Sequence, residues 1–239
     1  MKKISVDIIL PVYYGNINEL EESIKKQISV YPILLKDYNW RIIISINGQN
    51  ADDIIKLSRK LCKKYKNLKH FYTNIPGKGS GVINGWLKSK AEIRAYMDID
   101  LSVDLRCLPS LIKKIQDGYD VSIGSRYLKE SKVNRSFKRK IISIFYHLFL
   151  QQIILGTKYK DAQCGFKAIN KKVVNQILPL IRDRKWFFES EMLYLAQRKG
   201  MKIIEIPVIW KEGRFSSLNL LKVIPEFFSK MIEVRFRRI

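Results

Sequence analysis

Two carboxylates separated by one residue, Asp98 and Asp100, are the side chains in this sequence best placed to carry chemistry. They follow an apolar run, residues 93–97, that is typical of a buried strand. In an open α/β sheet, ligands bind at the carboxyl ends of the strands, so acidic residues there face a crevice. Two oxygen ligands at that place suit Mg²⁺ or Mn²⁺, which in turn binds substrate phosphates. The alternative is that one carboxylate caps a helix and the other lies in a solvated turn.

A glycine-rich basic segment, residues 73–81, is the second chemical feature. It contains Lys78 and precedes a predicted helix that ends at Leu87, so backbone N–H groups and one ammonium would face an anion. The segment lacks the Walker A spacing, and a flexible turn is the other interpretation. Glu191 stands among aromatic residues, which favours a paired or perturbed carboxylate. Alternatively, Glu189 and Glu191 stabilise the N-terminus of a helix.

Strands and helices alternate along the chain, which predicts a mostly parallel sheet with right-handed crossovers. The patterns predict strands at residues 4–12, 40–46, 68–72, 93–97, 121–124 and 201–210, the last of them broken by Pro207. They predict helices at residues 18–30, 51–65, 108–117, 171–181 and 192–199, with a compact polar turn at residues 161–167. We expect one α/β domain over residues 1–217, followed by a basic amphipathic helix over residues 218–239.

The chain carries 45 Lys and Arg against 22 Asp and Glu, a net charge of +23, which indicates an anionic partner. Nucleic acid, acidic lipid and phosphorylated substrates all fit this charge. A basic segment, residues 129–140, precedes an apolar one, residues 141–150, that suits either an interfacial helix on anionic lipid or a buried core helix. The helix over residues 218–239 likewise suits a membrane surface or packing on the domain. We expect neither a signal peptide nor a membrane-spanning segment.

The three cysteines, Cys62, Cys107 and Cys164, have no CxxC spacing and are odd in number. This pattern predicts neither a zinc site nor a disulfide framework. A reducing compartment is therefore expected.

Five short motifs occur in a fixed order along the chain. They are Pro11-Val12-Tyr13, Asp98-Ile99-Asp100, Gly124-Ser125-Arg126-Tyr127, Asp161-Ala162-Gln163-Cys164-Gly165-Phe166-Lys167 and Trp186-Phe187-Phe188-Glu189-Ser190-Glu191. Together they resemble the family 2 glycosyltransferases, and within that family the dolichyl-phosphate glucosyltransferase and dolichyl-phosphate mannose synthase branch. The resemblance implies a GT-A (Rossmann-like) fold, a UDP- or GDP-hexose donor, Mg²⁺ or Mn²⁺, and inversion at the anomeric carbon. It also implies a polyprenyl phosphate acceptor, dolichyl or undecaprenyl.

On the donor side, the resemblance implies roles for individual residues. Pro11 and Tyr13 would line the nucleotide pocket, and Lys78 would lie near it. Asp98 and Asp100 would hold the metal on the donor diphosphate, where a cation neutralises charge that develops on the leaving group. Asp100 is also expected to be catalytic, by orienting the donor or stabilising a cationic, sugar-like transition state.

On the acceptor side, arginines would bind the phosphate through planar bidentate hydrogen bonds. The resemblance places Arg126, Arg139 and Arg214 there, with Arg126 and Arg139 also expected to take part in catalysis. Gln163 and Glu191 are further site candidates. A phosphate monoester is already ionised at neutral pH, so transfer would depend on positioning and electrostatics and would need no strong base.

Three positions depart from the family pattern. Tyr14-Gly15 stands where Asn-Glu is usual, and Ser216-Ser217-Leu218 lacks a Lys that the mannose synthase branch places after a Ser. Ile46-Asn47 replaces an acidic pair that touches the base, so Asn47 would contact the base through uncharged hydrogen bonds. The preference for uracil or guanine therefore stays open at this point.

Other functions remain possible from sequence. A family member could act on a saccharide or a lipid-linked glycan, or it could have lost activity. A nucleic-acid-binding module would explain the charge, but the usual readout motifs are not evident and the charge is strongest beside apolar segments, so no nucleic acid is expected. The leading hypothesis is a hexosyltransferase bound peripherally at the cytoplasmic face of an anionic membrane.

Overall fold

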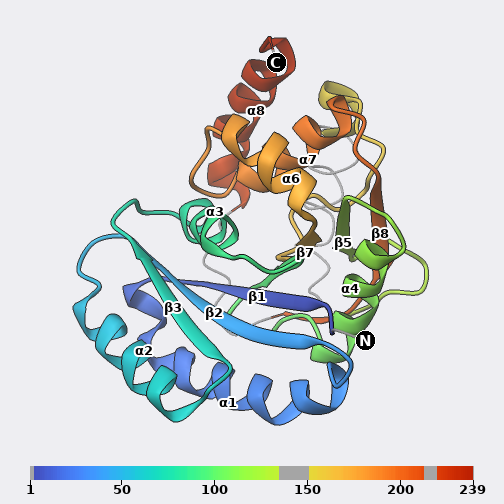
Figure 1. The fold of residues 1–239 in the computed structure, drawn as a ribbon. Coiled ribbons are helices and arrows are strands. Elements are labelled where there is room, and N and C mark those ends of the chain that lie inside the picture. Colours follow the sequence, from blue (N-terminus) through green and yellow to red (C-terminus); the bar gives the residue numbers. More distant parts are fainter. Residues whose placement is uncertain (1–2, 135–150, 213–219, 239) are drawn as a thin grey trace.

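A seven-stranded sheet with the order β3-β2-β1-β4-β7-β5-β8 forms the centre of the computed structural model, which describes residues 3–134, 151–212 and 220–238 (Figure 1). Its strands are β1 (Ser5–Val12), β2 (Asn39–Asn47), β3 (Leu68–Thr73), β4 (Ile93–Met97), β5 (Val121–Ser125), β7 (Phe166–Ile169) and β8 (Ile203–Pro207). β1 pairs in parallel with β2 and β4, β2 with β3, and β5 with β8. β7 runs antiparallel to β4 and β5. The mixed, mostly parallel sheet expected from the sequence is confirmed.

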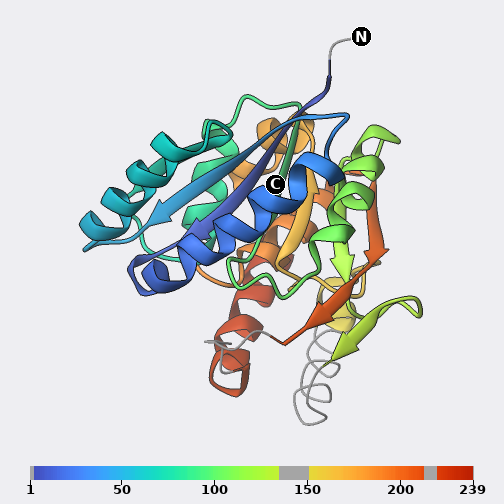
Figure 2. The ribbon, with the colours of Figure 1, turned by 90° about the horizontal axis from the view of Figure 1, so that it is seen from below.

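Helices cover both faces of this sheet, which explains why its central strands are apolar on both sides. One face packs against α1 (Ile17–Leu34), α2 (Asp52–Lys64) and α4 (Leu108–Gln116). The other packs against α3 (Lys78–Lys88), α6 (Lys171–Gln176), α7 (Phe188–Arg198) and α8 (Leu220–Phe236) (Figures 1 and 2). In β2, Ile42 and Ile44 contact the first layer and Ile43 the second, all fully buried or nearly so. Each such side chain contributes about 1.5–3 kcal/mol of burial free energy, so the two layers fix the sheet from both sides.

A second, two-stranded sheet lies beside the segment that follows Asp100. β6 (Lys132–Asn134) and β9 (Ile209–Lys211) pair in parallel, side by side in Figure 2. β9 also bridges the chain after β4, because Trp210 pairs with Val103 and the Lys211 N–H donates to the Ser102 carbonyl. The small sheet therefore fixes the backbone on the far side of the two aspartates.

Several predicted boundaries are wrong, each for a local reason. α3 begins at Lys78, so Gly79 and Gly81 lie in the helix and not in a loop. The predicted helix 171–181 ends at Gln176 and is followed by a 3-10 turn that contains Pro179. α7 begins at Phe188, four residues earlier than predicted. The predicted strand 201–210 is interrupted at Pro207, as expected, and forms β8 and β9. β7 was missed because its four residues fall partly inside the predicted polar turn.

The C-terminal helix α8 packs on the domain. Phe227, Met231 and Val234 are buried, and the ring of Phe227 meets that of Phe187 edge-on at 5.5 Å. The sequence allowed this segment either to lie on a membrane surface or to pack on the domain, and the structure shows packing on the domain. The apolar segment 141–150 lies outside the described residues. Within the described ranges, no helix has the length and hydrophobicity needed to cross a bilayer.

Candidate functional site

Asp98 and Asp100 lie in a tight turn at the carboxyl end of β4, the edge where the ends of β1 and β2 also meet. Leu101 closes the turn with a φ of 52°, a left-handed conformation that non-glycine residues rarely adopt and that recurs at functional sites. The Leu101 N–H donates to the Asp98 carbonyl at 3.3 Å. Ser102 donates to Asp100 from its N–H at 3.0 Å and its hydroxyl at 2.7 Å. The turn therefore holds the Asp100 carboxylate directly and fixes the backbone at Asp98.

The electrostatics of this turn fit a divalent cation. Desolvation raises the pKa of the Asp100 carboxyl, and the nearby negative charge of Asp98 raises it further. Two carboxylates that repel each other gain most from a shared cation. In the described part of the chain, no group of three or more His, Cys, Asp or Glu could hold a metal ion. Two carboxylates with remaining positions for water and phosphate oxygens are the donor set that Mg²⁺ commonly takes in phosphate sites.

Gly165 sets the position of Asp98. The Asp98 N–H donates to the Gly165 carbonyl at 3.1 Å. A Cβ atom at position 165 would lie only 1.9 Å from Asp98 Oδ2. The carboxylate therefore occupies the space that a side chain at 165 would need. The glycine of the motif 161–167 is thus explained by close approach to the candidate metal ligand.

Lys78 reaches the same carboxylate from the first turn of α3. Its Nζ lies 2.8 Å from Asp98 Oδ1 and 3.8 Å from Glu189 Oε1, and its side chain is 11% exposed. Burial by itself would lower the pKa of Lys78, but the charges of Asp98 and Glu189 outweigh it and raise the pKa. The ammonium also lies over the rings of Tyr96 and Trp186, at 5.6 and 5.4 Å from their centroids.

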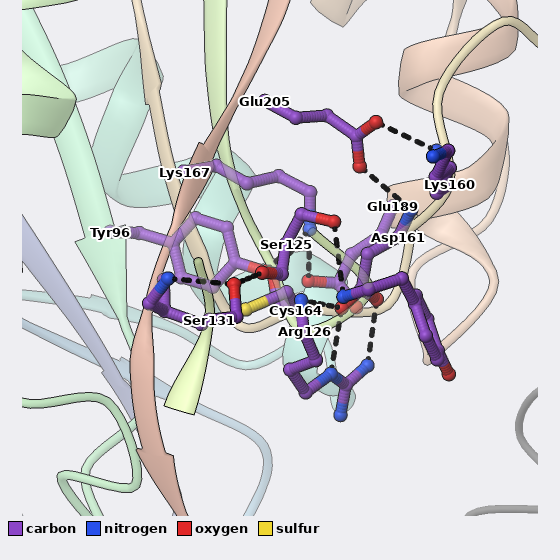
Figure 3. Close-up of polar contacts among 12 residues, drawn as sticks. Tyr96, Ser125, Arg126, Ser131, Lys160, Asp161, Cys164, Lys167, Glu189 and Glu205 are labelled. Carbon is purple, nitrogen blue, oxygen red and sulfur yellow. Dashed lines mark hydrogen bonds and ion pairs between the residues drawn. The ribbon is translucent and has the colours of Figure 1, made fainter. Parts of the chain in front are cut away.

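A second lysine, Lys167, contacts the same Glu189 carboxylate as Lys78. Its fully buried Nζ is 2.8 Å from Glu189 Oε1 and donates to the Cys164 carbonyl at 2.6 Å (Figure 3). Burial lowers the pKa of Lys167 to about 7 and raises that of Glu189 to about 7. The pair carries no net charge whether the proton lies on the amine or the carboxylate. Glu189 thus connects Lys167 to Lys78 and, through it, to Asp98.

Arg126 is engaged inside the protein. Its Nε and Nη2 both donate to the Asp161 carboxylate at 2.7 Å, and its backbone N–H donates to the same carboxylate at 2.9 Å (Figure 3). The Arg126 side chain is 11% exposed and that of Asp161 is fully buried. Burial would lower the pKa of Arg126, but Asp161 outweighs it and raises the pKa. The guanidinium expected at the acceptor phosphate therefore has a carboxylate partner already; Arg139 and Arg214, the other two expected there, lie outside the described residues.

At the nucleotide end, Asn47 is turned inward. It is 5% exposed, its Nδ2 donates to the Val12 carbonyl at 2.8 Å, and its Oδ1 accepts from the Gly77 N–H at 3.1 Å. The amide therefore ties the end of β1 to the start of α3, and an aspartate could not supply the donor to Val12. Pro11 is buried, whereas Tyr13 is 51% exposed and presents its ring to solvent.

Gln163 and Glu191 make contacts within the fold. Gln163 donates to the Ser190 hydroxyl at 2.8 Å. Glu191 accepts from the N–H groups of Arg182 and Asp183 and forms a 2.8 Å salt bridge with Arg237, the residue that directly follows α8. It is thus a paired carboxylate in the first turn of α7, and it joins the C-terminal helix to the domain.

Three residues that shape the site were not singled out from the sequence: Gly165, Lys167 and Asp161. All three belong to the motif 161–167. The available signal was a lysine between the apolar residues Phe166 and Ala168, because a lysine in an apolar run is buried only when it is paired. Asp98, Lys78, Gly165, Lys167 and Glu189 come together in one cluster. Arg126 and Asp161 form a neighbouring one (Figure 3).

Comparison with known proteins identifies the family. The sequence profile of Glycosyl transferase family 2 matches residues 7–178, most of the chain. The chain belongs to glycosyl transferase family 2. This family 2 chain is 26% identical over 223 residues to the glycosyltransferase AglD of Haloferax volcanii. The matched region covers 92% of the chain and 35% of AglD.

Two further relatives carry more specific names. A dolichyl-phosphate beta-glucosyltransferase of Trichomonas vaginalis is 30% identical, over 79% of the chain and 59% of the relative. A dolichol-phosphate mannosyltransferase of Pyrococcus furiosus is 30% identical, over 84% of the chain and 55% of the relative. The family 2 chain thus spans between about a third and three fifths of the length of these relatives.

The fold is shared with glucosyl-3-phosphoglycerate synthase of Mycobacterium tuberculosis. That enzyme, crystallised with Mn²⁺, UDP and glucosyl-3-phosphoglycerate, superposes with a TM-score of 0.64 at 13% identity. The match covers 97% of this chain and 80% of the synthase. The expected GT-A fold is confirmed.

Proposed function

We propose that this family 2 chain transfers a hexose, glucose or mannose, from a UDP- or GDP-sugar to a polyprenyl phosphate, with inversion at the anomeric carbon. The observation that carries the proposal is the cluster of Asp98, Asp100 and Lys78 at the carboxyl edge of the sheet. The names of the Trichomonas and Pyrococcus relatives support the lipid phosphate as acceptor.

Asp98 and Asp100 would hold Mg²⁺ or Mn²⁺. When bound, such an ion neutralises charge on the diphosphate leaving group. The Mn²⁺ and UDP in the crystallised synthase support this assignment. The protein's own contribution is to keep the two carboxylates oriented: Gly165 and the Leu101 turn fix them, and Ser102 occupies lone pairs of Asp100.

Lys78 would supply a positive charge to the donor phosphates from the N-terminal turn of α3, which itself favours anions. The acceptor phosphate is ionised at neutral pH and attacks without a general base, so positioning and electrostatics carry the rate. Exposed Tyr13 and buried Pro11 would line the nucleotide pocket, and Asn47 would act by holding its walls together.

On the acceptor side, we assign phosphate binding foremost to Arg139 and Arg214. Arg126 would bind a phosphate only if its guanidinium released the buried carboxylate of Asp161. We assign to Arg126 a second role, which is to fix the turn 161–167 through that ion pair. Gln163 would hold α7 beside that turn, and Glu191 would hold α7 to the chain that follows α8.

Peripheral attachment to the cytoplasmic face of an anionic membrane is the setting that we propose. The net charge of +23 supports it. So does the outer face of α8, where Phe228, Ile232 and Phe236 are exposed at 47%, 39% and 77% next to Arg235 and Arg238.

A donor and acceptor panel tests the proposal. Radiolabelled UDP-glucose and GDP-mannose are incubated with Mn²⁺ and a short polyprenyl phosphate, and lipid-bound label is measured. We expect label from one donor, lost in Arg139→Ala and only partly kept in Arg139→Lys, because Lys lacks the bidentate geometry. No lipid product with any donor would refute the lipid acceptor. Label on a saccharide acceptor, insensitive to Arg139→Ala, would favour the glycan alternative, which the engagement of Arg126 by Asp161 keeps open.

A further inference from the structure

Lys78 forms an ion pair with Asp98, a carboxylate that a divalent cation would need as a ligand. In the protein by itself, its Nζ lies 2.8 Å from Asp98 Oδ1, a direct ion pair at a residue assigned to the metal. Asp98 is 37% exposed on its side chain, so it is open to an ion from solvent. An ammonium and a metal ion cannot share one carboxylate oxygen at contact distance without strong repulsion.

The backbone that carries Lys78 is fixed, so only its side chain can move. The preceding Gly77 has a φ of 115°, and a Cβ there would lie 2.2 Å from the Arg184 carbonyl oxygen. The N–H groups of Gly79 and Ser80 donate to the carbonyls of Lys185 and Arg184 at 3.0 and 2.9 Å. The long, flexible stem of Lys78 is therefore anchored at a rigid base.

A second resting place for the ammonium is present. Glu189 Oε1 lies 3.8 Å from Lys78 Nζ, and the rings of Tyr96 and Trp186 flank it. Glu189 is held in turn by Lys167 at 2.8 Å. Lys78 can thus leave Asp98 and still lie beside a carboxylate and two ring faces.

Charge balance sets the order of events. Lys167 and Glu189 cancel each other, so Asp98, Asp100 and Lys78 leave the site with one negative charge. A site of that sign attracts a divalent cation and repels a diphosphate. After the cation has bound, the sign is reversed and the site attracts the diphosphate.

We propose that Lys78 is an exchangeable counter-ion: it pairs with Asp98 in the free protein, is displaced when the divalent cation binds, and then pairs with the donor diphosphate. This inference rests on the proposed nucleotide-sugar site. It assigns to one side chain two effects of opposite sign, because Lys78 weakens cation binding to the free protein and strengthens nucleoside diphosphate binding to the cation-loaded protein. Lys78 would thereby favour cation binding before, or together with, the nucleotide.

Binding measurements on the full chain test the exchange without any sugar transfer. Mn²⁺ affinity is measured without nucleotide, by calorimetry and by the electron paramagnetic resonance signal of free Mn²⁺, and UDP and GDP affinities are then measured at saturating Mn²⁺. In Lys78→Met we expect Mn²⁺ to bind about tenfold more tightly, since a unit charge near the cation is removed. The nucleoside diphosphate should bind about tenfold more weakly. Lys88→Met, which removes a lysine from the other end of the same helix, should change both affinities by less than about twofold.

Mn²⁺ affinity that is unchanged or weaker in folded Lys78→Met, as judged by circular dichroism, would overturn the exchange, and so would unchanged nucleotide binding. If Lys78→Met does not fold, Lys78→Gln provides the same comparison, because it keeps a hydrogen-bond donor and lacks the charge. Lys78→Arg should retain wild-type Mn²⁺ affinity within about threefold, since the charge remains. Failure of the proposed function would look different: the wild type would transfer no sugar, whatever its Mn²⁺ affinity.

Discussion

Replacing Gly165 with alanine should disable the site while leaving the fold in place. The new Cβ would lie 1.9 Å from Asp98 Oδ2, whereas ordinary contact begins at 3.4 Å. The Asp98 carboxylate must therefore move by about 1.5 Å, because a close-packed interior gives little elsewhere. The backbone at Gly165 is not in the left-handed region, so alanine fits the chain itself.

A misplacement of about 1 Å in a catalytic group costs about 100-fold in rate. This equals about 2.7 kcal/mol of activation free energy, at 1.36 kcal/mol per factor of ten. We therefore expect Gly165→Ala to lose about 100-fold or more in kcat/KM for Mn²⁺-dependent sugar transfer and to bind Mn²⁺ more weakly.

Gly118→Ala is the matched control for this substitution. Gly118 has a φ of 92° and no atom within 4 Å of an added Cβ, so alanine there strains a distant turn. It should lower the free energy of unfolding by about 1 kcal/mol with activity retained. If Gly165→Ala keeps its activity within about threefold of wild type, Gly165 does not position Asp98, and the reasoning from close approach is refuted.

Three further substitutions test contacts that stabilise the fold. Asp161→Asn leaves the buried guanidinium of Arg126 without its carboxylate, and we expect the free energy of unfolding in urea to fall by about 3–5 kcal/mol. Phe227→Ala opens a cavity against Phe187 where α8 docks, with an expected loss of about 3–5 kcal/mol in the same measurement. Burial would raise the pKa of Asp120, but hydrogen bonds from Lys202 and Asn170 keep it below its ordinary value. Asp120 therefore contributes stability above about pH 4 that is lost as the pH falls further, and Asp120→Asn should flatten the decline of the urea midpoint below about pH 4.

Each of these three expectations has a clear contrary result. Wild-type stability in Asp161→Asn would mean that Arg126 finds another anion and is free to bind one. A loss below about 1 kcal/mol in Phe227→Ala would mean that α8 does not depend on this contact. An unchanged acid slope in Asp120→Asn would remove Asp120 from the groups that titrate on folding.

The sheet and its strand-end aspartates were predictable from the sequence because local patterns encode them. Apolar runs of buried isoleucine, such as Ile42 to Ile46, predict strands covered on both faces, and alternation with helices predicts parallel pairing. Asp98 and Asp100 follow such a run directly. Their place at the carboxyl edge of the sheet then follows from the topology.

Other features depend on contacts between distant segments and could not be read locally. Asn47 looks like a free polar residue at a strand end, yet its amide is used by Val12 and Gly77. Arg126 looks like a phosphate ligand, and its partner Asp161 is 35 residues away. A pattern of residue types gives the chemistry that is available, whereas long-range pairing decides which groups remain open to a ligand.

The central claim is that Asp98 and Asp100 hold the donor diphosphate through a divalent cation. Its most direct test is UDP and GDP binding by calorimetry, with and without Mn²⁺, in wild type and in Asp100→Asn, with circular dichroism as the check on folding. We expect the wild type to bind one nucleotide only when Mn²⁺ is present, and folded Asp100→Asn to lose both Mn²⁺-dependent binding and sugar transfer. Wild-type nucleotide affinity and transfer in Asp100→Asn would contradict the claim and leave the two aspartates as residues of a structural turn.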